Sequence, residues 1–187
     1  MSSIKLFGLS GSLRKESNST AILKTLAEKI APEALLEIGD IGSIPLYNQD
    51  LEADVPSAVV KMRQQVAESG GVLFVTPEYN YGMSGVIKNA VDWLSRPAGK
   101  SCLIGKPFLI ISSSPAATGG VRAQAQLRES VMACSARPVV SGEIVMTAVH
   151  TKIAEGRLTD QASIDFALKA LNKLIADAKT TSTAKAA

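Results

Sequence analysis

The segment "IKLFGLSGSLRKESNSTAILKTLAEKI", residues 4–30, decides the fold because it joins two opposite patterns through one unusual loop. Residues 4–10 form a short apolar run that is typical of a buried strand. Residues 17–30 place Ala21, Ile22, Leu26 and Ile30 at helical spacing, which predicts a helix. The connecting stretch 8–20 carries five hydroxyl side chains, two glycines and Arg14.

The same alternation of strand and helix continues along the chain. Five helices are predicted, and the strands between them are mostly continuous apolar runs, as strands buried on both faces require. This pattern predicts an α/β fold in which helices cover both faces of a five-stranded parallel sheet. Strands are expected over 4–10, 34–40, 71–76, 106–114 and 137–146, and helices over 17–30, 56–69, 83–95, 119–133 and 160–178. Residues 1–178 are expected to form one domain and 179–187 a mobile polar tail.

Composition excludes several classes of protein. The 187 residues suffice for one domain with a sizeable core, and a net charge of +3 without basic blocks gives no sign of nucleic-acid binding. No run approaches the roughly 20 apolar residues of a membrane span, and no signal peptide is predicted at the N-terminus. Cys102 and Cys134 lack CxxC spacing and lie in apolar surroundings, so reduced thiols and a cytoplasmic location are expected.

The first loop has the composition of an anion site. A loop that enters a helix presents free backbone N–H groups and the positive end of the helix dipole. Ser12, Ser17 and Ser19 add hydroxyl donors, and Arg14 adds a permanent cation, which together suit a phosphate monoester. The alternative is that Ser17 is a helix N-cap and the other hydroxyls are solvated. The P-loop, dinucleotide-binding and nucleophile-elbow motifs do not fit, and the single histidine, His150, gives little support to a Ser-His hydrolase.

The loop "TPEYNYG", residues 76–82, follows the third predicted strand. It contains Tyr79 and Tyr81, two of only three tyrosines in the chain. One interpretation is a turn with an incidental aromatic pair. The other is a platform for a planar heterocycle, with backbone N–H groups facing its acceptors. Ligands of such sheets bind beyond the carboxyl ends of the strands, where this loop, residues 10–20 and residues 112–120 are expected to meet.

Three segments resemble the NADPH-dependent FMN reductase family, whose members include chromate, quinone and azo-dye reductases. They are "GSLRKES" at 11–17, "PEYNYGMSGVIKNAVDWLSR" at 77–96 and "SSSPAATGGVRAQAQLR" at 112–128. Their order and approximate spacing match the family from about Ile4 to Val145. The resemblance implies a flavodoxin-like, doubly wound sheet of order 2-1-3-4-5 that binds FMN without a covalent link.

The resemblance also assigns residues to parts of FMN. Ser12, Arg14, Ser17 and Ser19 match the phosphate positions, and Asn18 is a further candidate because the family commonly has Asn where Ser19 stands. Two sets match the segments around the isoalloxazine ring: Pro77, Glu78, Tyr79 and Asn80 beneath it, and Ser113 and Ser114 beside it.

The activity implied by the resemblance is that of an NAD(P)H oxidoreductase with a ping-pong cycle. NADPH, or NADH, gives hydride to bound FMN, and a quinone, azo compound, chromate or free flavin then accepts it. The flavin carries this chemistry, so no catalytic side chain and no metal site are expected. Two other classes stay open: a flavodoxin-like electron carrier and a non-enzymatic flavin-binding module. Such carriers are typically acidic, whereas this chain has a pI of about 8.9.

Assembly as a homodimer or dimer of dimers is predicted, with FMN near a subunit boundary. The apolar residues of 81–94 cover more than one face of a helix, which suggests a partner. The alternative is that residues 41–56 cover the extra face, including Trp93, within one chain. For Lys88 the choice is between attracting the nucleotide's phosphates and facing water, and for Arg122 and Arg128 between inter-subunit ion pairs and solvent.

Overall fold

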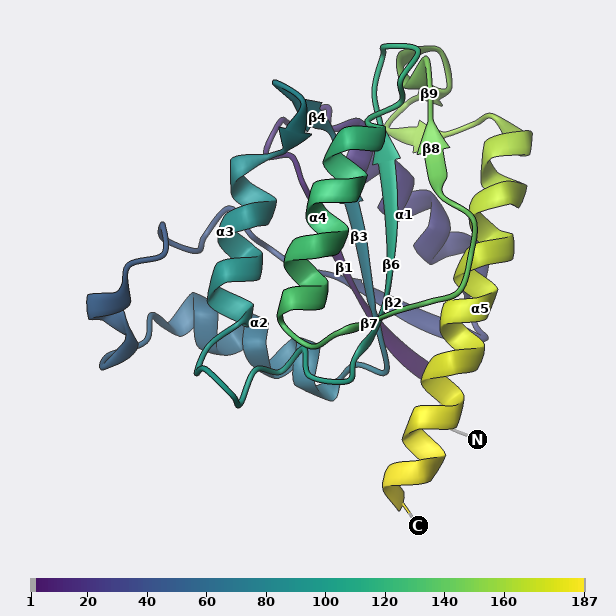
Figure 1. The fold of residues 1–187 in the computed structure, drawn as a ribbon. Helices are drawn as coiled ribbons and strands as arrows, with labels where there is room; N and C mark the ends of the chain where they lie inside the picture. The colour runs from purple at the N-terminus through teal and green to yellow at the C-terminus, as the bar shows by residue number, and fades with distance from the viewer. Residues whose placement is uncertain (1–2, 187) are drawn as a thin grey trace.

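A computed structural model describes residues 3–186 and contains a central parallel sheet (Figure 1). Its strands lie in the order β2-β1-β3-β6-β7, and β8 also pairs with β6. Every pair in this sheet is parallel, and counting β7 and β8 as one position gives the order 2-1-3-4-5. The predicted flavodoxin-like topology is therefore confirmed. The strands are β1 (Ile4–Ser10), β2 (Ala34–Ile38), β3 (Val72–Thr76), β6 (Pro107–Ser113), β7 (Arg137–Pro138) and β8 (Ile144–Met146).

The fifth strand differs from the continuous strand predicted over 137–146. Strand β7 pairs with the start of β6 and β8 with its end. Residues 139–143 belong to neither strand, although the Val139 N–H still donates to the Phe108 carbonyl at 2.9 Å. Pro138 has no N–H to donate, and Ser141 and Gly142 favour a loop, so the apolar character of this region did not suffice to keep it regular.

The helices form two layers, one on each face of the sheet (Figure 1). Side chains of a single strand alternate between two cores: Leu6, Leu73 and Leu109 pack on one face, and Phe7 and Phe74 on the other. This confirms a sheet buried on both sides. The first core contains α1 (Asn18–Ile30) and α5 (Gln161–Ala186), and the second α2 (Ser57–Glu68), α3 (Gly85–Leu94) and α4 (Val121–Ala133).

Two short hairpins at the carboxyl end of the sheet were not predicted (Figure 1). One pairs β4 (Glu78–Tyr79) with β5 (Gly82–Met83), and the other pairs β9 (Ile153–Ala154) with β10 (Arg157–Leu158). Both turn through two residues with positive φ, as type I′ turns require. Two 3₁₀ turns, Gln49–Glu52 and Val149–Thr151, complete the described elements.

The loop 41–56 covers the apolar face of α3 that suggested a partner subunit. Trp93 is fully buried within the single chain. Its Nε1 donates to the Pro45 carbonyl over 2.9 Å, and the Tyr47 ring packs edge-on at 5.0 Å between centroids. The surplus of apolar residues on this helix is therefore no argument for a dimer, and the alternative explanation is correct.

The last helix continues to Ala186, beyond residue 178 where the sequence indicates its end. Residues 179–186 thus extend a helix rather than begin a separate loop, and Ala187 of the expected tail lies outside the described residues. The division of the chain at residue 178 stays a prediction. Within residues 3–186, no helix has the length and apolarity needed to span a lipid bilayer.

Candidate active site

The first loop begins where β1 ends and is anchored by its own hydroxyls. The Ser17 side chain caps α1 by accepting from the Thr20 N–H at 3.2 Å, so the N-cap interpretation of Ser17 is correct. The hydroxyls of Ser10 and Thr20 lie 2.8 Å apart. Ser12 Oγ accepts from the Arg14 N–H at 3.3 Å. These bonds use the oxygens of Ser12 and Ser17 as acceptors and leave both O–H groups able to donate.

Gly11 allows the first loop to lie directly against the loop that follows β3. Its N–H donates to the Val75 carbonyl over 2.7 Å. A Cβ at this position would lie 2.9 Å from Pro77 Cδ and 3.0 Å from Thr76 Cα. Neither atom belongs to a flexible side chain, so glycine is required for the contact between the loops.

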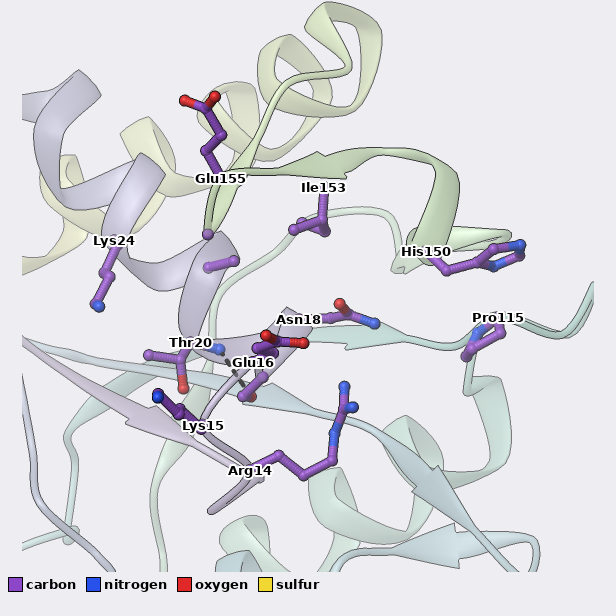
Figure 2. A pocket seen from close by; sticks show the side chains of 13 residues that line it. Arg14, Lys15, Glu16, Asn18, Thr20, Lys24, Pro115, His150, Ile153 and Glu155 are labelled. Atoms are coloured by element: carbon purple, nitrogen blue, oxygen red, sulfur yellow. Dashed lines mark hydrogen bonds between the residues drawn. The ribbon is translucent and has the colours of Figure 1, made fainter.

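The Arg14 side chain is free to meet a ligand. It is exposed and makes no ion pair or hydrogen bond with the described residues. Figure 2 shows its guanidinium directed toward Asn18 and Pro115. Of the two alternative phosphate residues, Ser19 is buried and Asn18 is partly exposed.

The β4–β5 hairpin is fixed to the start of α4 through Glu78. Its carboxylate accepts from the Arg122 Nε at 2.8 Å and from the backbone N–H groups of Arg122 and Ala123 at 3.1 and 3.4 Å. The Arg122 guanidinium also stacks 3.9 Å from the centre of the Tyr81 ring. Glu78 therefore acts as the cap of α4, which has no cap of its own at Gly120.

The electrostatics of Glu78 follow from this placement. Burial raises the pKa of its carboxyl group, but hydrogen bonds from Arg122 and the Ala123 N–H lower it by more. The pKa of Glu78 therefore lies below the ordinary glutamate value, and its carboxylate is charged at neutral pH. A second bond, from the Met83 N–H to Gln126 Oε1 at 2.9 Å, ties the other strand of the hairpin to α4.

Asn80 and Tyr81 form the tip of this hairpin. Their φ angles are 49° and 65°, in the left-handed region. Asn80 tolerates this conformation well, whereas a bulky aromatic residue adopts it at a cost. The stacked guanidinium of Arg122 stabilises the ring of Tyr81 there.

The third loop leaves β6 at Ser113 and is held from the β8 side. The Ser114 N–H donates to the Met146 carbonyl at 3.0 Å, and its carbonyl accepts from the Val149 N–H at 3.2 Å. Ser114 Oγ accepts from the Ala116 N–H. Ser113 Oγ is buried and has no hydrogen-bond partner in the described part of the chain.

The three loops enclose one cavity of about 290 Å³. All the predicted site residues line it except Asn80, which lies at the hairpin tip. The lining residues are Ser12, Arg14, Ser17, Asn18, Ser19, Pro77, Glu78, Tyr79, Ser113, Ser114 and Pro115. The sequence did not single out Pro115, although it directly follows two predicted residues.

The chemistry of this cavity fits FMN. One end offers an uncommitted arginine, hydroxyl donors and the N-terminus of α1, which suit a phosphate. The other end offers the exposed Tyr79 ring and the Ser113 hydroxyl, which lacks a hydrogen-bond partner among the described residues and which a ligand acceptor would satisfy.

Comparison with known proteins decides the family. Residues 4–151 match the model of the family described as NADPH-dependent FMN reductase. The chain belongs to that family. It is 38% identical over 173 residues to an NAD(P)H-dependent FMN reductase of Pseudomonas aeruginosa, covering 91% of this chain and 93% of the relative. A quinone reductase of Escherichia coli is 37% identical over 169 residues, which cover 87% and 88% of the two chains.

A solved structure gives the same result. The flavoenzyme NAD(P)H:(acceptor) oxidoreductase FerB from Paracoccus denitrificans superimposes with a TM-score of 0.84 at 31% identity, over 95% of this chain and 98% of that one. The predicted family and fold, the flavin-dependent NAD(P)H oxidoreductase activity and the use of FMN and NAD(P)H are confirmed. Family membership favours the enzyme over the electron carrier and the binding module.

Three further cations have partners within the chain. Lys88 pairs with Asp92 one turn away at 2.6 Å on an exposed helix face, which is the solvated role. Arg122 holds Glu78, and Arg128 donates to Gln124 Oε1 at 3.2 Å and lies 3.8 Å from Glu143. Arg122 therefore ties α4 to the β4–β5 hairpin, and Arg128 ties α4 to the loop before β8, an arrangement that neither alternative for them included.

Proposed function

We propose that this FMN-dependent NAD(P)H oxidoreductase holds FMN in the 290 Å³ cavity, with the phosphate at the first loop and the ring between the β4–β5 hairpin and the third loop. The observation that carries this assignment is the convergence of residues from three distant segments on one cavity. Their chemistry divides along it, cationic and hydroxyl-rich at the α1 end and aromatic at the hairpin.

At the phosphate end, Arg14 supplies the charge and the hydroxyls supply directed donors. Ser12 and Ser17 already accept backbone N–H groups, so each can turn its O–H toward a phosphate oxygen. Asn18 and Ser19 follow at the first turn of α1, where the helix N-terminus also favours an anion. Ser17 thus combines a structural role with a binding role.

At the ring end, the hairpin presents backbone rather than charge. The Glu78 carboxylate is occupied by α4, so its role is to position Pro77, Tyr79 and Asn80 beneath the ring. The Tyr79 side chain is 51% exposed and offers an aromatic surface. Ser113 donates its hydroxyl, which has no partner within residues 3–186, to a ring acceptor, and Ser114 fixes the loop beside it.

When it is bound, FMN supplies the hydride-transfer chemistry. The residues of the cavity orient it, and backbone donors near the ring stabilise negative charge. We propose that NAD(P)H and the acceptor use the open side of the cavity in turn, which is the ping-pong order. Quinones, azo compounds, chromate and free flavins are the proposed acceptors among small molecules.

Two measurements test this function. The purified protein should show the visible absorption of oxidised flavin or gain it when FMN is added. NADPH oxidation should then depend on a quinone acceptor, and double-reciprocal plots at several acceptor concentrations should be parallel. Intersecting lines would exclude the ping-pong order, and the absence of any FMN binding would exclude the assignment of the cavity.

Assembly as a homodimer or dimer of dimers stays a proposal. It is supported by four apolar or aromatic side chains near the cavity or loop 41–56 that are each more than half exposed: Leu13, Leu46, Tyr79 and Tyr81. Sedimentation velocity at micromolar concentration tests it, with Leu46→Glu as the variant that should weaken association. A wild-type species near 19.6 kDa would contradict it. A cytoplasmic location is proposed from the two free cysteines.

A further inference from the structure

A second cavity, of about 650 Å³, meets the proposed FMN cavity at its phosphate end (Figure 2). Arg14, Ser17, Asn18 and Pro115 line both cavities, whereas Tyr79, at the ring end, lines the FMN cavity alone. The second cavity has the size of a small-molecule site, which is typically roughly 300–1,000 Å³. A ligand that continues from the FMN cavity into the second one must therefore extend from its phosphate.

The phosphate position is open on this side. Arg14 is exposed and Asn18 is partly exposed, and the cavity continues past them along α1 as far as Lys24. A loop that served only a terminal phosphate would gain from enclosing it, because a charged contact is stronger away from water. The open side leaves room for a phosphate that is esterified at both ends.

The second cavity carries two lysines that no part of the proposed FMN site uses. Lys15 and Lys24 line it beside Arg14, and neither forms an ion pair with a described residue. Lys24 feels the charge of Glu28, but that carboxylate pairs with Arg157 at 2.7 Å. In the view of Figure 2 both ammonium groups lie on one side of the start of α1, and the Arg14 guanidinium lies on the other. These cations can attract a second phosphate next to the one at the first loop.

Two carboxylates also line the second cavity. Figure 2 shows the Glu155 side chain directed away from the first loop, whereas Glu16 lies near Asn18 within the group. A glutamate at this place would repel a phosphate but can accept a hydrogen bond from a ribose hydroxyl. The cavity therefore suits a phosphate that is joined to a sugar.

The remaining wall is apolar and held in place. Pro115 and Ile153 supply carbon surface, and the imidazole of His150 is exposed beside them. The hairpin that carries Ile153 is anchored on α1, because the Leu158 N–H donates to Thr25 Oγ1 at 2.9 Å. This wall can pack against a planar base without first having to fold.

We propose that the flavin site also accepts FAD, with the adenylate half of FAD in the second cavity. The FMN half keeps the place proposed for FMN. Lys15 and Lys24 attract the second phosphate, Glu16 accepts from a ribose hydroxyl, and the adenine packs on Ile153 and Pro115. The inference rests on the proposed FMN site, since the adenylate is attached through the phosphate that is held there.

The charges of the two flavins give a sharp expectation. The terminal phosphate of FMN carries nearly two negative charges at neutral pH, whereas each phosphate of the FAD pyrophosphate carries about one. The first loop alone should therefore hold FAD more weakly than FMN. Contacts of the second phosphate and the adenosine in the second cavity offset this loss, so FAD should bind at least as tightly as FMN.

Fluorescence titration of the flavin-free protein with FMN and with FAD tests this inference. The dissociation constant of the wild type for FAD should be no higher than that for FMN. The double variant Lys15→Glu/Lys24→Glu should lose about tenfold or more in affinity for FAD, because it replaces two attractive charges by repulsive ones. Its affinity for FMN should change by less than about threefold, because neither lysine lines the FMN cavity and exposed charges are screened with distance.

The matched control is Lys29→Glu/Lys61→Glu, which changes the net charge equally at exposed lysines outside the second cavity. Lys29 lies on the same helix as Lys24, and both lower the pKa of Glu28. The control should leave the affinities for both flavins within about twofold. A wild type that binds FAD more weakly than FMN would overturn the proposal. So would an unchanged FAD affinity in the double variant, equal losses for FMN and FAD there, or an equal loss of FAD affinity in the control.

Hydrogen exchange locates the adenylate without any variant. The backbone amides of residues 150–158 should exchange more slowly in the FAD complex than in the FMN complex, because the adenosine packs on this segment and opposes its local opening. Equal exchange in the two complexes would show that the adenylate stays in solvent, and the proposal would be wrong.

These measurements separate the inference from the function on which it rests. If FMN binds and FAD binds more weakly, the second cavity does not hold the adenylate and the proposed function stands. If FAD binds as expected but the protein does not oxidise NADPH, the proposed function fails and the binding site stands. If neither flavin binds, both are wrong.

Discussion

The first loop and the β4–β5 hairpin line the same cavity, but the rest of the protein holds them differently. The first loop is stabilised by bonds among its own residues, such as Ser17 to Thr20, and its cation Arg14 has no partner in the described chain. The hairpin is held by another element: Glu78, Met83 and Tyr81 all contact residues of α4.

This difference separates two ways of building a binding surface. The first loop leaves the Arg14 guanidinium and the O–H groups of Ser12 and Ser17 able to donate to a ligand, although the oxygens of both serines already accept backbone N–H groups. The hairpin has its one charged side chain, Glu78, fully engaged, so it offers a shaped backbone and aromatic rings. Changes in the first loop should therefore alter binding, and changes at the hairpin should alter stability and geometry.

The largest expected effect comes from the ligand itself. Riboflavin lacks the phosphate and would leave the first loop facing no anion. Two or more charge-assisted hydrogen bonds, each contributing about 1.5–3 kcal/mol, would be lost, which corresponds to roughly a hundred- to ten-thousandfold in affinity. Quenching of flavin fluorescence during titration of apo-protein measures both constants. Comparable affinities for riboflavin and FMN would contradict the proposed difference between the first loop and the hairpin, because the first loop would then not bind the phosphate.

Replacing Arg14 by alanine is expected to have the next largest effect. Removing one charged partner should weaken FMN binding by roughly ten- to a hundredfold. Thermal stability of the apo-protein should hardly change, because the side chain is exposed and makes no bond to the described residues. Lys29→Ala, at an exposed lysine outside the FMN cavity, is the control. An affinity equal to that of the wild type would remove Arg14 from the phosphate site.

Gly11 tests the contact between the two regions. Gly11→Ala places a methyl group about 3 Å from Pro77 Cδ and Thr76 Cα, neither of which can move freely. Such overpacking costs roughly 1–3 kcal/mol, or several degrees in Tm for a chain of this size. Thermal unfolding of the apo-protein measures it, with Gly85→Ala as control, because a Cβ there meets nothing within 4 Å. Equal Tm values for wild type and Gly11→Ala would show that the two loops can move apart at little cost in stability.

The fold could be predicted from the sequence because its strands are continuous apolar runs with helices between them. The break in the fifth strand was missed, since Val139 and Val140 look like strand residues although Val140 is 89% exposed. Both small hairpins were missed as well, because neither contains the Asn-Gly or Asp-Gly turn that identifies such a hairpin locally.

The candidate site, like the fold, could be predicted from the sequence only in part. The composition of the first loop predicted an anion site only as one of two alternatives, and the resemblance to the family assigned Arg14 and the serines to the phosphate of FMN. The role of Glu78 was not predicted, because its partner Arg122 lies 44 residues further along the chain and meets it only when α4 packs beside the hairpin. For the same reason the contact between Trp93 and the loop 41–56 could be listed only as an alternative.

Replacing Glu78, which caps α4, is expected to give the smallest change in stability, and this change should depend on pH. Glu78→Gln removes the charge that caps α4 and pairs with Arg122, and loss of a helix cap costs about 0.5–2 kcal/mol. The pKa of Glu78 is lowered in the folded protein, so its contribution is present above the unfolded pKa and is lost as the pH falls through the folded pKa. The difference in unfolding free energy between wild type and variant should therefore be full at neutral pH and vanish in acid below the ordinary glutamate range.

Urea unfolding at neutral and acidic pH measures this difference, with Glu16→Gln, on the exposed first loop, as the matched control. A difference that persists unchanged in acid would mean that Glu78 stabilises α4 through packing rather than through its charge. The hairpin would then not be held by a charged contact, and the proposed contrast with the first loop would fail.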